Sequence, residues 1–538
     1  MSEAGTQVTI ELPEELVYAP AVLILSEDLY PRKLEVVREY IQNASDALDD
    51  FRPVAELIED RAEPVIKISV QGRSLVIFDT GTGMDALDMP KLKRIAYSEK
   101  RQGEEAGYKG IGRLAGIAVA DKLKISSTSY GDSKLHTFEF LAGDMRDDVS
   151  SKKKSGQQEP ASVVINRHTK ISTTDIDPES HYTMVELRDI RESCLEILET
   201  DALHEYIADI APVGFAPDDE FKYGSMISDD LLQHVPDYSP KNVYLSSGGE
   251  RTRIYKPYNN SMMLSPPKFF EILDPDERKH TLAYGWYATK GREMLGKTKP
   301  AGKIFAVDGK DAEEKHRFAG LVYKLFGFSI GDRTLPQRTL WTTTQNRAQW
   351  FTGEIHIVDK RVQPTTDRSN FIENEWRAKL YEDGREFAQK LNKEAQRISD
   401  DRQAFDTSER VRKKLEECRS RLGNRQIDRA DLKREREEIT RQLELLKQRQ
   451  GKCRDNDFLN VIKEVRRLGT AVQEDLTNPK LLKKSKSVTD IAADLKMTDK
   501  VQKLFAIVME TLQDYYAADK EEYDQVSGKI YSALRKKY

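Results

Sequence analysis

Acidic and amide side chains mark the first place in this sequence where chemistry could take place. The segment Val37–Asp50 has helical periodicity. Within it, Glu39, Asn43 and Asp46 are spaced by four and then three residues, so on a helix they share one face. A carboxylate there could polarise a water molecule, and an amide oxygen could bind a divalent cation. The same pattern also fits an ordinary solvated amphipathic helix.

A second segment joins a strand-like run to two closely spaced glycines. Val76–Phe78 continues into Asp79, and Gly81 and Gly83 follow. A carboxylate buried at a strand end can accept a hydrogen bond from an exocyclic amine. The glycines would let the backbone approach a flat ring closely. The alternative is an ordinary Asp-Thr-Gly turn.

A third segment is rich in glycine and precedes a predicted helix. In Ala106–Leu123, Gly107, Gly110 and Gly112 lead into a helix expected to begin near Arg113. Backbone N–H groups in such a loop, together with a helix N-terminus, can bind phosphate. No strand directly precedes the loop, so a Rossmann fingerprint fits it poorly.

Short alternating runs predict the strands that would position these motifs. The polar stretch Asp147–Pro160 predicts a loop. The first two of the runs, and the next two, are close enough to pair as hairpins. The five runs are Val65–Val70, Ser74–Asp79, Lys122–Thr128, His136–Leu141 and Thr183–Asp189.

In this order, the three segments resemble the N-box and the two glycine boxes of the GHKL superfamily. That superfamily comprises gyrase-type topoisomerases, heat-shock chaperones, histidine kinases and MutL-like proteins. The resemblance is closest to the ninety-kilodalton heat-shock chaperones, because Arg38–Asp49 and the passage into Val119–Lys122 look like that family's site. It covers residues 20–200 strongly and 210–375 faintly. It implies a Bergerat-fold α/β sandwich that binds ATP with Mg²⁺.

The resemblance also implies roles for individual residues. Glu39 would be the general base that polarises the attacking water, Asn43 would ligate Mg²⁺, and Asp79 would bind the adenine amino group. A lid would extend from about residue 85 to 106. The further ATP-binding positions implied are Asp46, Gly81, Gly83, Met84, Ser98, Lys100, Lys109, Gly110, Ile111, Gly112, Arg113 and Thr183.

Two positions of the second glycine box depart from the chaperone pattern. Lys109 and Arg113 stand where that family has aromatic residues. Their cations could contact the phosphates or could face solvent.

A candidate for a second catalytic residue lies much later in the chain. Gly353–Glu375 resembles the middle-domain stretch in which the chaperones place an arginine on the γ-phosphate, and Arg368 is the matching residue. Such a cation would neutralise charge that develops during phosphoryl transfer. Arg368 could instead form a surface ion pair. Other candidates for a cationic or polar contact are Lys297, Lys299, Gln345, Asn346 and Arg347.

The character of the chain changes after about Glu375. Proline becomes rare, and apolar residues recur at helical spacing in two seams that Gly423 and Gly451 terminate. This pattern predicts an antiparallel helical hairpin or coiled coil. The seams consist of Val411, Leu415, Cys418, Leu422 and of Leu432, Ile439, Leu443, Leu446.

We therefore predict an α+β protein with four regions. Residues 1–205 would form the Bergerat ATPase domain, and residues 206–376 a second, transducer-like α+β middle domain. Residues 377–477 would form the helical hairpin. Residues 478–538 would form a C-terminal helical segment after a basic linker.

Charge, cysteine spacing and the absence of long apolar runs limit the classes of protein to which this sequence could belong. The 538 residues carry 86 basic and 91 acidic side chains, with a net charge of −5, and 38% are hydrophobic. The three cysteines are widely separated, which favours a reducing compartment. No leader segment and no membrane-spanning run are recognisable. The expectation is a cytoplasmic protein that does not enter a membrane.

Two functions remain open at this stage, and a third, a binding module without turnover, is disfavoured because Glu39 and Asn43 are both present. The first is a homodimeric ATP-dependent clamp that couples lid closure to action on a protein partner or client. The alternative is a MutL-like or MORC-like ATP-gated clamp on DNA, in DNA maintenance or antiviral defence. The basic clusters Lys483–Lys486 and Arg535–Lys537 favour the alternative, although short charge runs are usually solvated. No histidine lies on a recognisable dimerisation helix before the ATP site, which argues against a histidine kinase.

Overall fold

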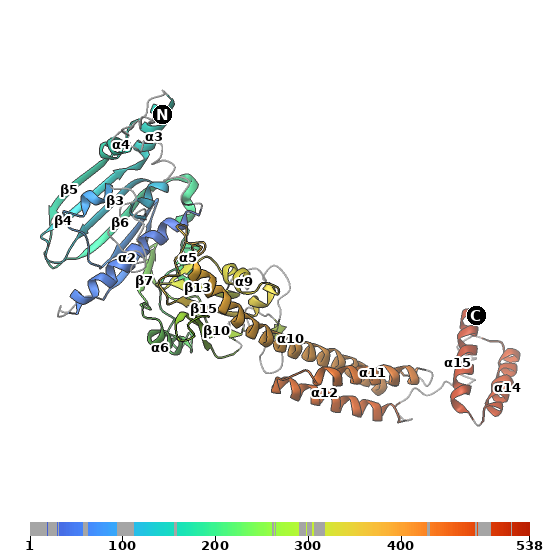
Figure 1. Ribbon diagram of the computed structural model, residues 1–538. Coiled ribbons are helices and arrows are strands. Elements are labelled where there is room, and N and C mark those ends of the chain that lie inside the picture. The colour runs from blue at the N-terminus through green and yellow to red at the C-terminus, as the bar shows by residue number, and fades with distance from the viewer. Residues whose placement is uncertain are drawn as a thin grey trace, which may run out of the picture. The chain divides into compact units, whose positions relative to one another are not determined.

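The architecture comes from a computed structural model. It describes residues 19, 30, 32–56, 63–93, 112–154, 159–260, 263, 265–289, 297–298, 304–305, 318–427, 431–478, 481, 497–517 and 519–537. The chain divides into two compact units, residues 1–297 with 304–391 and residues 298–303 with 392–538. The first unit holds two mixed α+β layers, and the second is helical, as the sequence predicts (Figure 1).

An eight-stranded sheet forms the first layer. Its order is β5-β4-β3-β6-β2-β1-β7-β8, and every described pair is antiparallel except β1 with β7. Two strands from beyond residue 205 thus complete the sheet; the predicted domain boundary itself stays a prediction. The strands are β1 Val65–Gln71, β2 Ser74–Asp79, β3 Ala120–Thr128, β4 Lys134–Leu141, β5 Thr169–Asp175, β6 Tyr182–Ile190, β7 Asn242–Ser247 and β8 Glu250–Ile254.

Helix α2 (Leu34–Ala55) lies along one face of this sheet (Figure 1). Alternation along β2 explains why: Leu75, Ile77 and Asp79 are buried on the face that α2 covers, and the residues between them are only half-buried. The helix contributes its apolar stripe to the same core. The remaining helices of this layer are α3 Ala142–Lys154, α4 Ala161–Arg167, α5 Thr200–Ile210 and the 3₁₀ helices η1 Met89–Lys93, η2 Gly112–Ala118 and η3 Glu192–Leu198.

Two local expectations need correction. The first half of the polar stretch that begins at Asp147 is not a loop, because α3 continues through it to Lys154; residues 155–158 lie outside the described residues. Its lysines extend the helix from an apolar start in which Met145 and Val149 are buried. The helix expected near Arg113 is the 3₁₀ helix η2, which ends where β3 begins.

A five-stranded sheet forms the second layer, in the order β14-β13-β15-β10-β9. Strand β15 is buried along its whole length, consistent with a central position. The elements are β9 Lys268–Leu273, β10 Thr281–Thr289, β13 Gly320–Leu325, β14 Phe328–Ile330, β15 Phe351–Ile357, helices α6 Gly224–His234 and α9 Thr334–Leu340, and η6 Gln345–Trp350; β11 Lys297–Thr298 and β12 Ile304–Phe305 form a separate ribbon.

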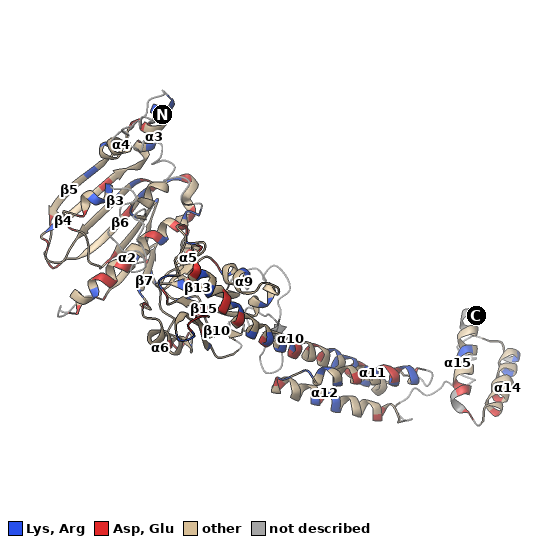
Figure 2. Cartoon of the chain, in the orientation of Figure 1, with Lys and Arg blue, Asp and Glu red and all other residues tan. Residues whose placement is uncertain are grey.

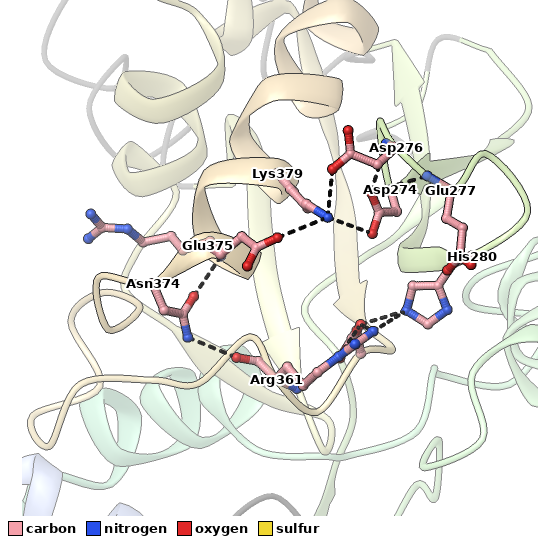
Figure 3. A network of polar contacts seen from close by, with 10 residues as sticks. Asp274, Asp276, Glu277, His280, Arg361, Asn374, Glu375 and Lys379 are labelled. Carbon is pink, nitrogen blue, oxygen red and sulfur yellow. Dashed lines mark hydrogen bonds and ion pairs between the residues drawn. The ribbon is translucent and has the colours of Figure 1, made fainter.

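Charged side chains attach the start of helix α10 (Glu375–Gly423) to this second layer (Figure 3). Lys379 contacts Asp274 at 3.2 Å, Asp276 at 2.8 Å and Glu375 at 3.2 Å. Further along the helix, Phe387 stacks on Phe270 of β9 with ring centroids 3.8 Å apart. The first turns of α10 therefore belong to the packing of the middle layer.

The second unit is built from helices with charged surfaces, as Figure 2 shows along α10, α11 and α12. The predicted hairpin is present: α10 ends at Gly423, and α11 (Leu432–Gln450) is followed by Gly451. Lys414 pairs with Glu438 across it at 2.8 Å. The remaining helices are α12 Asn456–Asp475, α14 Asp499–Tyr515 and α15 Lys520–Lys537. Within the described residues, none of the helices is both long and apolar enough to cross a membrane.

Candidate functional site

The acidic face of α2 is formed as the sequence predicts. Glu39, Asn43 and Asp46 all lie within α2; the first two are half-buried and Asp46 is buried. The glycine segments reach this helix at two points. Gly81 meets Ala47, and Gly112 meets Glu39. These points are eight residues, or about 12 Å, apart along the helix axis. An extended nucleotide can span such a distance, with its base at one end and its phosphates at the other.

At the Ala47 end, a row of polar residues crosses the sheet. Asp79 pairs in register with Thr183, which in turn pairs with Ser127, so the three side chains share one face. The Ser127 hydroxyl lies 2.9 Å from Thr183 Oγ1 and accepts a hydrogen bond from the Met84 N–H at 2.9 Å. The row therefore holds the backbone of the first glycine segment beside the Asp79 carboxylate.

The Asp79 carboxylate is buried and can accept a further hydrogen bond from a ligand. It is 5% exposed, and Gly81 N–H donates to its Oδ1 at 2.9 Å. Burial raises the pKa of Asp79 to about 7, although the Gly81 hydrogen bond opposes that rise. A neutral amine on a bound ring would supply a further hydrogen bond to the ionised carboxylate.

The backbone at position 83 leaves no room for any side chain. Its φ is +68°, and a Cβ atom there would lie 1.9 Å from the carbonyl oxygen of Thr128. Only glycine tolerates both the left-handed backbone and this close approach. The turn between β2 and η1 is thereby held flat against the end of β3.

At the other end, Gly112 begins η2 directly against the candidate base. A Cβ atom at Gly112 would lie 2.3 Å from Glu39 Oε2. Tyr40 fixes this contact, because its hydroxyl accepts from Gly116 N–H at 2.7 Å and donates to the Arg113 carbonyl at 3.2 Å. Arg113 itself is half-buried. Loop backbone and a carboxylate are thus brought together where phosphates and water would meet.

The loop of Arg368 is bonded to the second layer beside β14, the strand that Arg38 of α2 contacts through Ser329. Burial raises the pKa of the Tyr30 hydroxyl, Glu39 raises it further, and Arg368 lowers it. Both charges therefore act on one hydroxyl. Arg368 has a φ of +55°, in a loop whose carbonyl at Arg368 accepts from Gly331 N–H at 2.8 Å. Backbone strain of this kind is common at functional sites.

The other candidate residues lie elsewhere in the fold or outside the described residues. Gln345, Asn346 and Arg347 lie in η6, and Lys297 lies in β11. The predictions for Ser98, Lys100, Lys109, Gly110, Ile111 and Lys299, and for most of the lid, concern positions outside the described residues.

The chemistry of Asn43 fits a magnesium ligand. Its half-buried side chain stands one turn from Glu39 and makes no hydrogen bond to another described residue. Among the described residues no group of three or more His, Cys, Asp or Glu could hold a metal ion alone. An ion here would therefore share its coordination with phosphate oxygens and water, which is the usual manner of Mg²⁺.

Comparison with known proteins agrees with this geometry. Residues 32–183 match the family described as histidine kinase-, DNA gyrase B- and HSP90-like ATPase. They form a GHKL-type ATPase domain. The matched segment includes the acidic helix face, both glycine segments and Thr183. The predicted GHKL membership, with its chaperone-like character, is confirmed for this part of the chain.

Individual relatives support the chaperone branch of the GHKL domains. Chaperone protein HtpG of Rickettsia prowazekii is 30% identical over 135 residues, which cover 22% of this chain and 22% of that protein. HtpG of Psychrobacter arcticus is 30% identical over 129 residues, or 20% of each chain, and HtpG of Borreliella burgdorferi is 29% identical over 121 residues, or 19% of this chain and 20% of that protein. The chain thus matches only about a fifth of the length of these relatives.

Sequence reasoning missed two residues that the structure places in the candidate site. Ser127 was predicted only as part of a strand, and Tyr40 only as an apolar position of the helix. Both act through contacts across the sheet or to a distant loop, with sequence separations of 43 and 76 residues. No local spacing indicates such contacts.

Proposed function

We propose that this chain is an ATP-driven conformational clamp that hydrolyses ATP with Mg²⁺ and acts as a homodimer on a protein partner in the cytoplasm. One observation carries the proposal. Gly112 lies against the Glu39 carboxylate, and the neighbouring Arg38 bonds the Ser329 carbonyl in β14, two residues before Gly331, which bonds the Arg368 carbonyl. A GHKL domain that only bound nucleotide would not need this link to the second layer.

In this proposal, different residues of the chain bind the base, bind the phosphates and activate the attacking water. Asp79, with Thr183 and Ser127 beside it, selects the adenine base. Glu39 accepts the proton of the attacking water, and η2 donates backbone N–H groups to the phosphates. Arg368 neutralises charge on the terminal phosphate. Mg²⁺, held through Asn43, would supply further charge neutralisation when bound.

Arg38 supplies a route from this chemistry to the second layer. It precedes Glu39, is buried, and donates through Nη2 to the carbonyl of Ser329 in β14. A shift of α2 at the site therefore moves a hydrogen bond that crosses between the two layers. This is the kind of link that converts nucleotide state into domain rotation.

Steady-state hydrolysis and nucleotide binding of the full chain test the proposal. We expect Glu39→Ala to bind ATP yet lose nearly all turnover, and Arg368→Ala to lower turnover while binding stays largely intact. Arg338→Ala serves as the control, because Arg338 is exposed on α9 and is not a candidate for the site. Equal loss of binding and turnover in Glu39→Ala would make that residue structural. Normal turnover in Arg368→Ala would remove it from the mechanism.

A clamp on DNA is the second candidate, and the outer face of the eight-stranded sheet favours it. Lys67, Tyr244 and Arg253 are neighbours in register on adjacent strands. Lys67 lies 5.3 Å from the centre of the Phe78 ring, and Arg251 lies 3.9 Å from that of Tyr244. None of these three cations has an ion pair with a residue that the structure describes. Cations interleaved with rings suit a nucleic-acid strand.

Salt-dependent DNA binding separates the two candidates. If DNA is the target, double-stranded DNA should stimulate turnover, and salt should suppress its binding steeply. Replacing both Lys67 and Arg251 by Ala should then weaken binding. Lys134→Ala, which removes a lysine paired with Asp175, should not. Turnover indifferent to DNA leaves the protein clamp as the function.

A further inference from the structure

Helix α14 exposes an apolar face in the part of the chain that the structure describes. Its other side packs on α15 through the buried Phe505 and Met509. Contiguous apolar surface of this kind marks an interaction site on a soluble protein. The exposed side chains, with their exposed fractions, are Val501 (39%), Leu504 (65%), Ile507 (60%), Val508 (46%) and Tyr515 (82%).

The spacing of these residues is that of a helix-pairing seam. Val501, Leu504, Val508 and Tyr515 follow at intervals of three, four and seven residues. They occupy the a and d positions of a heptad repeat, which pack into the side chains of a facing helix. Because α15 already covers the opposite side, the seam is suited to a second helix.

The charges beside the seam have an unusual order. Apart from Asp499, the first half of α14 carries Lys500 and Lys503, and the second half carries Glu510 and Asp514. An isolated helix favours the reverse order, with acidic residues near its start and basic residues near its end. None of these four side chains has an ion pair with another described residue. The order is therefore not explained within α14 or its contact with α15.

We propose that α14 pairs antiparallel with α14 of a second copy of this chain, around a two-fold axis at Ile507. Lys500 and Asp514 each lie seven residues from Ile507, on the same row of the helix. In an antiparallel pair, Lys500 of one copy then faces the partner's Asp514. The same symmetry brings basic Lys503 toward the acidic second half of the facing helix.

The charges of α14 complement those of a second α14 in antiparallel orientation, which favours a second copy of the chain over an unrelated protein. A parallel pairing would place like charges beside each other at both ends, which is unfavourable. The axis also accounts for the exposure of Ile507, which lies beside the seam and would contact its own copy. This inference rests on the homodimer of the proposed function and names the surface through which the two copies pair. Because the pairing requires no nucleotide, it can be tested even if hydrolysis fails.

The mass of the full chain in solution, measured without nucleotide, is the first test. The wild-type chain should have twice its chain mass at micromolar concentration, and the double substitution Leu504→Glu with Val508→Glu should reduce it to the monomer. Leu232→Glu on α6 is the matched control, because Leu232 is 56% exposed on a different helix. A monomeric wild type, or a double variant that stays dimeric, would overturn the proposal.

Charge reversal and cross-linking test the register, with substitutions too exposed to threaten folding. Lys500→Glu alone and Asp514→Lys alone should each weaken the dimer at least tenfold, and the combined variant should restore it. Ile507→Cys should form a disulfide-linked dimer, whereas Gln513→Cys on the far side should not. The native cysteines are buried and should not interfere. Failure of the combined variant to restore pairing, or equal cross-linking by both cysteines, would contradict the antiparallel register.

Discussion

In the proposed site, recognition of the base rests on the carboxylate of Asp79, whose pKa is raised to about 7. Asp79 is buried beside Thr183 and Ser127, and one hydrogen bond from Gly81 supports its charge. Burial therefore leaves its pKa near 7 instead of near 4. A ligand that donates to this carboxylate binds the ionised form and must compete with a proton.

Adenosine affinity should consequently rise with pH. Between pH 6 and pH 8 the ionised fraction of Asp79 grows about tenfold for a pKa of about 7, so affinity should grow by up to that factor and level off above pH 8. Adenosine is the appropriate ligand, because it has no phosphate that titrates in this range. Calorimetric titration of the full chain at several pH values measures the effect.

The control for this pH dependence is the substitution of the titrating group itself. Asp79→Asn should bind adenosine weakly at every pH, because its amide cannot become an anion and its NH₂ group opposes an amine donor. An affinity of the wild type that does not change between pH 6 and pH 8 would mean that Asp79 is not the base-reading group.

At the scale of elements, the site depends on how η2 is attached to α2. The Tyr40 hydroxyl links α2 to the first part of η2 through Gly116 and Arg113, whereas Arg146 and Arg191 bond carbonyls at its far end. Tyr40→Phe would leave the Gly116 N–H unpaired in a buried setting. We expect the variant to lose about 1–3 kcal/mol of stability.

The same variant separates the two ends of the site. Because η2 is proposed to hold phosphates, Tyr40→Phe should weaken ATP binding, whereas adenosine binding through Asp79 should be unchanged. Ser127→Ala is the matched variant at the other end, since it removes a hydroxyl from the base row and should weaken both ligands. Equal losses for ATP and adenosine in Tyr40→Phe would show that η2 acts on the whole fold and not on phosphate binding.

Elements with local patterns could be predicted from the sequence, and elements set by distant partners could not. The hairpin of β1 and β2 and the ends of α10 and α11 follow from alternation and from glycines, and all were found. Helix α3 was missed because its polar second half has no apolar periodicity. Strands β7 and β8 join the first sheet only through a parallel pairing with β1, which no local signal announces.

The candidate site follows the same division. Glu39, Asp79 and Gly112 were predictable, because each belongs to a short motif whose spacing has a chemical reason. A role for Arg368 beside Glu39 is a prediction from family resemblance alone, since more than 300 residues separate them and no local motif joins them. Lys109 and Lys100 lie outside the described residues, so their predicted contacts with nucleotide stay predictions.

At the scale of the whole first unit, polar side chains line the boundary between its two layers, and only some of them have hydrogen-bond partners. Arg38 reaches Ser329, but the amide of the fully buried Gln42, one turn further on, has no hydrogen-bond partner among the described residues. Behind Ser329, the Lys324 ammonium donates to Ser329 Oγ at 2.9 Å and to the Asp209 carbonyl at 2.6 Å. A boundary of this kind can shift at less cost than an apolar one, because few optimised contacts are lost.

Lys324 makes the stability of this region depend on pH. Burial and, secondarily, the nearby Lys256 lower the pKa of Lys324 to about 7. In the unfolded chain the lysine keeps a pKa near 10.4. Between these two values the unfolded state binds more protons than the folded state, so stability should rise with pH. From pH 7 to pH 9 the rise from this residue should be about 2 kcal/mol.

Urea unfolding of the wild type and of Lys324→Met at pH 7 and pH 9 tests this expectation. All four tryptophans, two of them the buried Trp286 and Trp341, lie between residues 286 and 376, so their fluorescence follows the second layer alone. Lys324→Met keeps the volume of the side chain and removes the titrating group, so its stability should gain less over the same interval. Other groups titrate equally in both proteins, and the difference isolates Lys324. Parallel gains would mean that folding does not lower the pKa of Lys324, so that the lysine stays charged in the folded protein up to pH 9.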